Sequence, residues 1–167
     1  TGKGFEFLAE MERMHMIVDV SHLSDKGFWD IVEHGTRPFA ASHSNCRALA
    51  PHTRNLTDEM IRALSERGGI AGLNYYAPFL DTDPTHPENC RSTVEMIAKH
   101  AAHYKQVGGA QMIALGSDFD GIDGPHQLEN AAFLPLLADA LRKEGFTEDE
   151  VEGIYYRNAM RFFEENL

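Results

Sequence analysis

Two segments of the sequence end in the same Ser-His pair, and their histidines are the residues most suited to bind a metal ion. The segments run from Met16 to His22 and from Pro38 to His43. Each is a mostly apolar run, which is typical of a strand buried on both faces of a parallel sheet. Neighbouring parallel strands lie about 4.8 Å apart, so imidazoles at their carboxyl ends can reach one ion. Histidine is a common zinc ligand, and we therefore treat His22 and His43 as candidate metal ligands.

A third apolar run is followed by carboxylates. Residues 112–115 lead into the sequence GSDFDG, which places Asp118 and Asp120 at the same sheet edge as the two histidines. Two histidines and an aspartate suit metal-assisted hydrolysis, in which the ion generates hydroxide and the carboxylate moves protons. Simpler interpretations stay open. A histidine at a strand end is more often hydrogen-bonded within the protein than bound to metal, and Asp-Gly sequences favour turns.

Arg54 and Asn55 lie in the segment after the second apolar run, and we place both among the candidate substrate-binding residues. An arginine in a loop above the sheet edge can bind a substrate carboxylate through two parallel hydrogen bonds. The alternative for Arg54 is a surface salt bridge to Asp58 or Glu59, which the spacing alone favours. Asp19, in the middle of the first run, is expected to bond to backbone or to a neighbouring strand.

Two further histidines, His100 and His103, lie three residues apart on one face of an expected helix. This spacing could bind a metal, but solvated side chains are the simpler expectation.

The elements that position these residues alternate along the chain. Apolar runs at 16–20, 38–41, 70–75 and 112–115 predict buried strands. Helix-capping residues predict the helix starts: Ser24, Thr57, Thr93, and Thr147 with Glu150 as a capping box. Strand–helix–strand repetition predicts an α/β fold with a parallel sheet. The expected helices cover residues 3–14, 24–34, 57–67, 93–107, 131–143 and 148–163, and the proline-rich segment 78–92 is expected to be a long loop.

The composition narrows the class of protein. With 167 residues and 43% hydrophobic content the chain can form one domain, but a complete (β/α)8 barrel typically takes about 250 residues. The net charge of −11 argues against nucleic acid or an anionic membrane surface as a partner. No apolar run approaches the roughly 20 residues of a membrane span, and two cysteines are too few for a disulfide scaffold. A cytoplasmic location is the resulting expectation.

Four motifs, taken together, resemble the renal/membrane dipeptidase family, which comprises zinc dipeptidases of the amidohydrolase-like barrel group. The motifs are IVDVSH at 17–22, SHSNCRAL at 42–49, RNLTDE at 54–59 and GSDFDG at 116–121.

The resemblance implies a (β/α)8 TIM barrel of which residues 1–167 form the C-terminal half, roughly its fifth to eighth strands with their helices. It implies hydrolysis of dipeptides by a metal-bound hydroxide, with two Zn²⁺ ions in a complete site. By this resemblance His22 and His43 bind the second zinc, Arg54 holds the free carboxylate of the dipeptide, and Asp118 is the acid/base.

The family also uses a His-x-Asp pair, a bridging Glu and a substrate-polarising His, and none of these is present in the chain. The chain would then supply ligands mainly for one zinc, and the N-terminal half of the barrel would come from a missing segment or a separate chain. His15 stands where relatives usually have Gly, and Phe79 where some have Tyr. Relatives commonly pair as homodimers. Two alternatives remain: a half-barrel that is inactive by itself, and a related amidohydrolase acting on a cyclic amide or lactam.

Overall fold

The fold is built around a small parallel sheet, as the alternation of strands and helices predicts. A computed structural model describes residues 1–81, 90–124 and 126–167. Its three strands, in the order β1-β2-β3, are all parallel. In register, Ala40 lies opposite Ile70 and Ala71 lies opposite Ile113. The strands are β1 (Ala40–Ala41), β2 (Ile70–Leu73) and β3 (Ile113–Leu115).

The first predicted strand, at 16–20, is shorter than expected. It runs parallel to β1 through a single bridge between Asp19 and Ala40. The amide of Ala40 donates to the carbonyl of Val18, and the amide of Val20 donates back to the carbonyl of Ala40. Pairing stops there because a turn begins at Val20, whose carbonyl accepts from the amide of Leu23. The segment nevertheless brings its Ser-His pair next to that of β1.

The predicted helix caps are confirmed. The side chains of Ser24, Thr57 and Thr93 each accept a backbone N–H from the first turn of the helix that follows. Thr147 and Glu150 form the expected capping box. The helices of this part of the chain are α1 (Gly2–Arg13), α2 (Asp25–His34), α3 (Asp58–Glu66), α4 (Ala77–Leu80) and α5 (Val94–Gly108).

The segment predicted as a long loop begins instead as α4. Residues 82–89 of that prediction lie outside the described part of the chain. A 3-10 turn (Ala110–Met112) then leads from α5 into β3.

The C-terminal region departs from the prediction of one long helix over 148–163. It consists of α7 (Glu148–Glu152), a π-helical turn labelled η4 (Gly153–Arg157), and α8 (Asn158–Asn166). Asn158, directly after the wide turn, donates through Nδ2 to the backbone carbonyls of Ala110 and Ile113. The preceding helix α6 (Leu134–Lys143) starts with the 3-10 turn Ala131–Phe133, which keeps the predicted range of 131–143.

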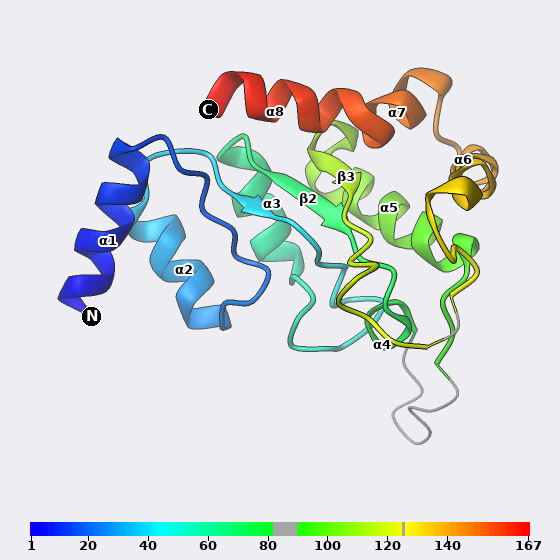
Figure 1. The fold of residues 1–167 in the computed structure, drawn as a ribbon, viewed down its shortest axis with the longest axis horizontal. Coiled ribbons are helices and arrows are strands. Elements are labelled where there is room, and N and C mark those ends of the chain that lie inside the picture. Colours follow the sequence, from blue (N-terminus) through cyan, green and yellow to red (C-terminus); the bar gives the residue numbers. More distant parts are fainter. Residues whose placement is uncertain (82–89, 125) are drawn as a thin grey trace.

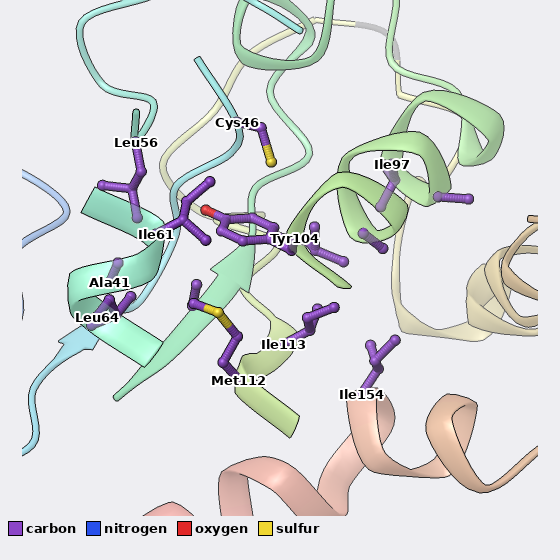
Figure 2. Packing of buried hydrophobic residues seen from close by; sticks show 14 of the residues in the cluster. Ala41, Cys46, Leu56, Ile61, Leu64, Ile97, Tyr104, Met112, Ile113 and Ile154 are labelled. Carbon is purple, nitrogen blue, oxygen red and sulfur yellow. The ribbon is translucent and has the colours of Figure 1, made fainter. Parts of the chain in front are cut away.

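The helices pack against the sheet, and loops follow the carboxyl ends of its strands. One face of the sheet packs on α3 and α5, where the buried ring of Tyr104 lies among Ile61 and Ile113 (Figure 2). A smaller cluster joins Phe162 of α8 to Ala40 and Ile70 at the beginnings of β1 and β2. Figure 1 shows α8 running along that side of the sheet, with α1 and α2 at one end and α5 and α6 at the other. Among the helices of the described residues, none has the length and apolar character needed to cross a membrane.

Candidate active site at the carboxyl edge of the sheet

The structure brings the two candidate metal ligands together. His22 follows the 16–20 segment and His43 follows β1, and their Nε2 atoms lie 2.9 Å apart. Their ring centroids are 4.9 Å apart. The parallel pairing of the two segments produces this approach, since each Ser-His leaves the sheet at the same level. Their role as ligands stays a prediction.

The orientation of His43 is set by a serine and a carboxylate. Ser42 Oγ lies 2.7 Å from His43 Nδ1 and also contacts Asp19 Oδ2. Asp19 Oδ1 accepts from the amides of Ser21 and Ser42, as expected for its bonding to backbone and a neighbouring strand. An ionised carboxylate only accepts, so Ser42 donates its proton to Asp19 and accepts from His43 Nδ1–H. His43 Nε2 then carries a lone pair rather than a proton.

The ionisation of Asp19 agrees with this assignment. Burial by itself would raise the pKa of Asp19, but hydrogen bonds from Ser42 and Ser21 outweigh it and leave the pKa below its usual value. Burial lowers the pKa of His43, Arg54 and His22 add to that effect, and the charges of Asp118 and Asp19 oppose it. His43 is therefore held as a neutral imidazole, which is the form that binds metal.

Arg54 lies beside the histidine pair. Its Nε donates to the carbonyl of Ser21 at 2.6 Å, and its Nη2 lies 3.1 Å from His43 Nε2. Because a guanidinium can only donate, this contact independently assigns the lone pair to His43 Nε2. The alternative prediction, a salt bridge from Arg54 to Asp58 or Glu59, is wrong: Arg54 contacts Ser21 and His43, and Asp58 pairs with His103 at 2.7 Å.

Asp118 is both a turn residue and a site residue. Its φ of 62° lies in the left-handed region, and its carbonyl accepts from the amide of Gly121, so the turn predicted from Asp-Gly chemistry is present. Its carboxylate meanwhile accepts a hydrogen bond from Asn74 Nδ2 at 3.2 Å. A Cβ at position 121 would collide with that carboxylate where it now lies, so a larger residue there would displace Asp118.

These side chains share a cavity of about 350 Å³. Of the predicted residues, His22, Arg54 and Asp118 line it, with Phe79. Sequence reasoning did not select Tyr76, Ile122 or Asp123. Tyr76 carried a usable signal, because it lies just past the end of a strand, at the edge where α/β proteins bind ligands. The lining residues are His22, Arg54, Tyr76, Phe79, Asp118, Gly121, Ile122 and Asp123.

Asn55 does not lie where a substrate-binding residue should. It is fully buried, and its Nδ2 donates to the carbonyls of Ala50 and Phe79. Its Oδ1 accepts from the amide of Asn45. All three interactions are with backbone, so the prediction of direct substrate contact is corrected: Asn55 holds the loop in which Arg54 lies.

The expectation of two solvated histidines on α5 is also corrected. His100 is buried, accepts the Cys46 amide at Nδ1 and lies 3.1 Å from the Leu80 carbonyl through Nε2. Burial lowers the pKa of His100 to about 4. His103 pairs with Asp58. Both imidazoles therefore hold structural contacts.

The donor set fits part of a zinc site. Two imidazoles whose Nε2 atoms lie 2.9 Å apart are suitable zinc ligands, but zinc in proteins takes at least three. Within residues 1–81, 90–124 and 126–167, no three His, Cys, Asp or Glu side chains form a metal-binding group. As candidate ligands, His22 and His43 would account for two positions of such a site, and the described residues add no third.

Comparisons with known proteins agree with the geometry. Residues 1–166 match a protein-family model described as membrane dipeptidase (peptidase family M19). An uncharacterized protein from the pqqA 5′ region of Klebsiella pneumoniae is 37% identical over 161 residues, which are 96% of this chain and 59% of that protein.

Two solved structures have the same fold. One is the dipeptidase AC, a metallopeptidase of family M19, with a TM-score of 0.91 and 32% identity over 99% of this chain and 48% of its own. The other is a metallopeptidase from Rhodobacter sphaeroides liganded with a phosphinate mimic of the dipeptide L-Ala-D-Ala, with a TM-score of 0.90 and 31% identity over 100% of this chain and 47% of its own. The chain therefore spans about half the length of the relatives it matches.

Proposed function

Because the chain belongs to the membrane dipeptidase family, peptidase family M19, we propose that the protein hydrolyses dipeptides that carry a free carboxylate. The observation that carries this proposal is one cavity lined by a candidate histidine ligand, a guanidinium and a carboxylate, from His22, Arg54 and Asp118. The solved relative liganded with a phosphinate mimic of L-Ala-D-Ala supports a dipeptide as the substrate class.

We propose that His22 and His43 hold one of two zinc ions of the complete site. The Ser42–Asp19 pair favours this because it leaves His43 Nε2 unprotonated and pointing toward His22. When bound, zinc supplies a nucleophile at neutral pH and polarises the scissile carbonyl. The remaining ligands would come from the rest of the barrel.

Arg54 and Asp118 have separate tasks in this proposal. The guanidinium of Arg54 is braced by the Ser21 carbonyl and lies over the ring of Phe79, with its carbon 5.3 Å from the ring centroid. It is thereby fixed in place to bind the substrate carboxylate. Asp118, across the cavity, transfers the proton between the attacking water and the leaving amine. Its carboxylate is oriented by Asn74.

We also propose that the chain forms about half of a (β/α)8 barrel domain, corresponding to the carboxyl-terminal part of its relatives. Its coverage of 48% and 47% of the two solved relatives supports this, as does the parallel order of its strands. The complete site, and any homodimer, would need the other part of the barrel.

The test is a comparison of a dipeptide with its carboxyl-terminal amide in the intact protein. Arg54→Ala should raise KM for the dipeptide by about 10- to 100-fold, because hydrogen bonds to a charged group contribute roughly 1.5–3 kcal/mol. It should leave hydrolysis of the amide nearly unchanged. Arg62→Ala, on the exposed face of α3, is the control and should behave as the unaltered protein. An unchanged kcat/KM for the dipeptide in Arg54→Ala would remove the proposed role.

A further inference from the structure

Three asparagines beneath the cavity are fully buried. Asn45 follows β1, Asn55 lies further along the same loop, and Asn74 follows β2 directly. A buried amide without hydrogen-bond partners is costly, so the partners of these side chains show what they hold together.

Asn45 joins the loop after β1 to the end of β2. Its Oδ1 accepts from the amide of Asn74 at 3.0 Å, and its Nδ2 donates to the carbonyl of Asn74 at 2.9 Å. The side chain thus pairs with the backbone as a neighbouring strand would, and extends the pairing of β2 past its last residue. The hydroxyl of Tyr104 on α5 donates to the carbonyl of Ser44, and this bond holds the backbone just before Asn45.

Asn55 joins the same loop to α4. The carbonyl of Phe79 accepts from both Asn55 Nδ2, at 2.9 Å, and Asn45 Nδ2, at 3.2 Å. The ring of Phe79 lies under the guanidinium of Arg54 and packs against His52. Fixing the Phe79 backbone therefore fixes the aromatic surface on which Arg54 rests.

Asn74 contacts Asp118, another residue that lines the cavity. Its Oδ1 accepts from the amide of Tyr76 at 2.6 Å, and its Nδ2 donates to Asp118 Oδ2. Because the amide of Tyr76 can only donate, Oδ1 must face it, and Nδ2 must face the carboxylate. The orientation of the Asn74 amide is thereby determined, and it presents a donor to Asp118.

We propose that Asn55, Asn45 and Asn74 form a continuous brace whose two ends position different functional groups. At one end Asn74 is a positioning residue for Asp118. At the other end Asn55 is a positioning residue for Arg54, through Phe79. This inference rests on the proposed dipeptidase function, in which Arg54 binds substrate and Asp118 moves protons.

Substitutions at the two ends of the brace should change different kinetic constants: kcat at Asn74 and KM at Asn55. A purely structural role would not separate the two constants. In Asn74→Asp the side chain keeps its size and its acceptor for Tyr76, but presents an acceptor to Asp118 in place of the donor. We expect kcat to fall at least about tenfold with KM within about twofold, since a hydrogen bond to a charged group is lost. Asn55→Asp keeps the acceptor for Asn45 but loses both donors, and we expect KM to rise at least about tenfold with kcat within about threefold.

Asn130→Asp is the matched control. Asn130 is exposed and caps the 3-10 turn before α6 through an acceptor that aspartate also has, so both kinetic constants should stay unchanged. Circular dichroism and thermal unfolding identify variants that do not fold. If Asn74→Asp is one of them, Asn74→Ser, whose hydroxyl is too short to reach Asp118, replaces it with the same expected result.

The brace would be overturned if both variants showed the same fall in kcat together with the same rise in KM. Normal kinetics in either variant would also overturn it. These kinetics are measured in the intact protein, in which the rest of the barrel is present. If that protein, without substitutions, hydrolyses no dipeptide, the proposed function is wrong, and hydrogen exchange then tests the brace separately. The Asn74 side-chain amide should exchange slowly, and Asp118→Ala should accelerate its exchange. Rapid exchange in the unaltered protein would overturn the inference.

Discussion

At the scale of single residues, the protonation of His43 is determined by its neighbours on both sides. Ser42 Oγ accepts a hydrogen bond from His43 Nδ1–H and donates one to Asp19, while Arg54 Nη2 donates toward His43 Nε2. Two unrelated contacts therefore agree that Nε2 carries a lone pair. Residues that orient a metal-bound histidine in this way typically change metal affinity by about 10- to 100-fold when they are removed.

We predict that Ser42→Ala and Asp19→Asn each weaken zinc binding by about 10- to 100-fold in the intact protein. Both changes free Nδ1–H and let the imidazole rotate or change tautomer. His22→Ala and His43→Ala should lower the zinc stoichiometry itself. Competition with a chelator measures the affinity, and elemental analysis measures the stoichiometry.

Ser65→Ala is the control for this prediction, because its hydroxyl donates to the carbonyl of Gly108 on the far side of α3. Its zinc affinity should equal that of the unaltered protein. Unchanged affinity in both Ser42→Ala and Asp19→Asn would contradict the orienting role, and full zinc content in both histidine variants would contradict the ligand assignment.

The sequence was most informative where the chemistry is local. The repeated Ser-His pair located His22 and His43, because parallel strands bring equivalent ends together. Asn55 was misassigned, because its partner Phe79 lies 24 positions away in the sequence and only the fold brings them together. The environment of His100 was missed for the same reason: its partner Cys46 lies in the loop after β1, and its partner Leu80 is the last residue of α4.

At the scale of elements, helix starts were predictable, and so was the course of α2, α3 and α5, whereas the break in the helix predicted over 148–163 was not. A cap depends on residues three positions apart, as at Ser24 and Thr57. The π-helical turn at 153–157 depends on distant contacts of Asn158 with the backbone around β3. His15 shows the limit of residue preference, since it adopts a φ of 58°, in the left-handed region that favours glycine.

Helix α5 contributes a pH dependence through His100. The folded protein holds this imidazole neutral, with its pKa lowered to about 4 by burial, whereas an unfolded chain has the ordinary value of 6.5. Between pH 6.5 and 4 the unfolded chain therefore binds a proton that the folded chain excludes, and stability falls as pH falls. The full difference corresponds to about 3 kcal/mol.

We predict that His100→Asn flattens this part of the stability profile. The asparagine can still accept the Cys46 amide but has no proton to bind. Urea unfolding at several pH values between 7 and 4 measures the free energy of unfolding of both proteins. The exposed His34, changed to Asn, is the control and should leave the slope as it is. An equal slope in His100→Asn and the unaltered protein would contradict the prediction.

At the scale of the whole molecule, the sheet has open sides. Met16, the first residue of the 16–20 segment, is 50% exposed, and Met14, two residues before it, is 58% exposed. Within the described residues no strand pairs with the outer side of that segment or of β3. Unpaired strand edges and exposed apolar side chains favour association with another polypeptide. The solved relatives are about twice as long as this chain, so the remainder of such a barrel is the partner that fits both features.

We predict that the 167-residue chain alone, supplied with zinc, does not hydrolyse dipeptides, and that adding a polypeptide corresponding to the rest of the barrel restores activity. Two imidazoles are too few to hold zinc in a catalytic site, and the partner would supply the missing ligands together with a strand for the 16–20 edge. Light scattering measures association, and a dipeptide assay measures turnover.

Met16→Lys places a charge at the edge of the 16–20 segment and should weaken association while leaving His22 and His43 in place. The matched change Met160→Lys, at an exposed position on α8, should affect it less. Turnover by the isolated monomer would show instead that the residues of this chain complete a catalytic site on their own.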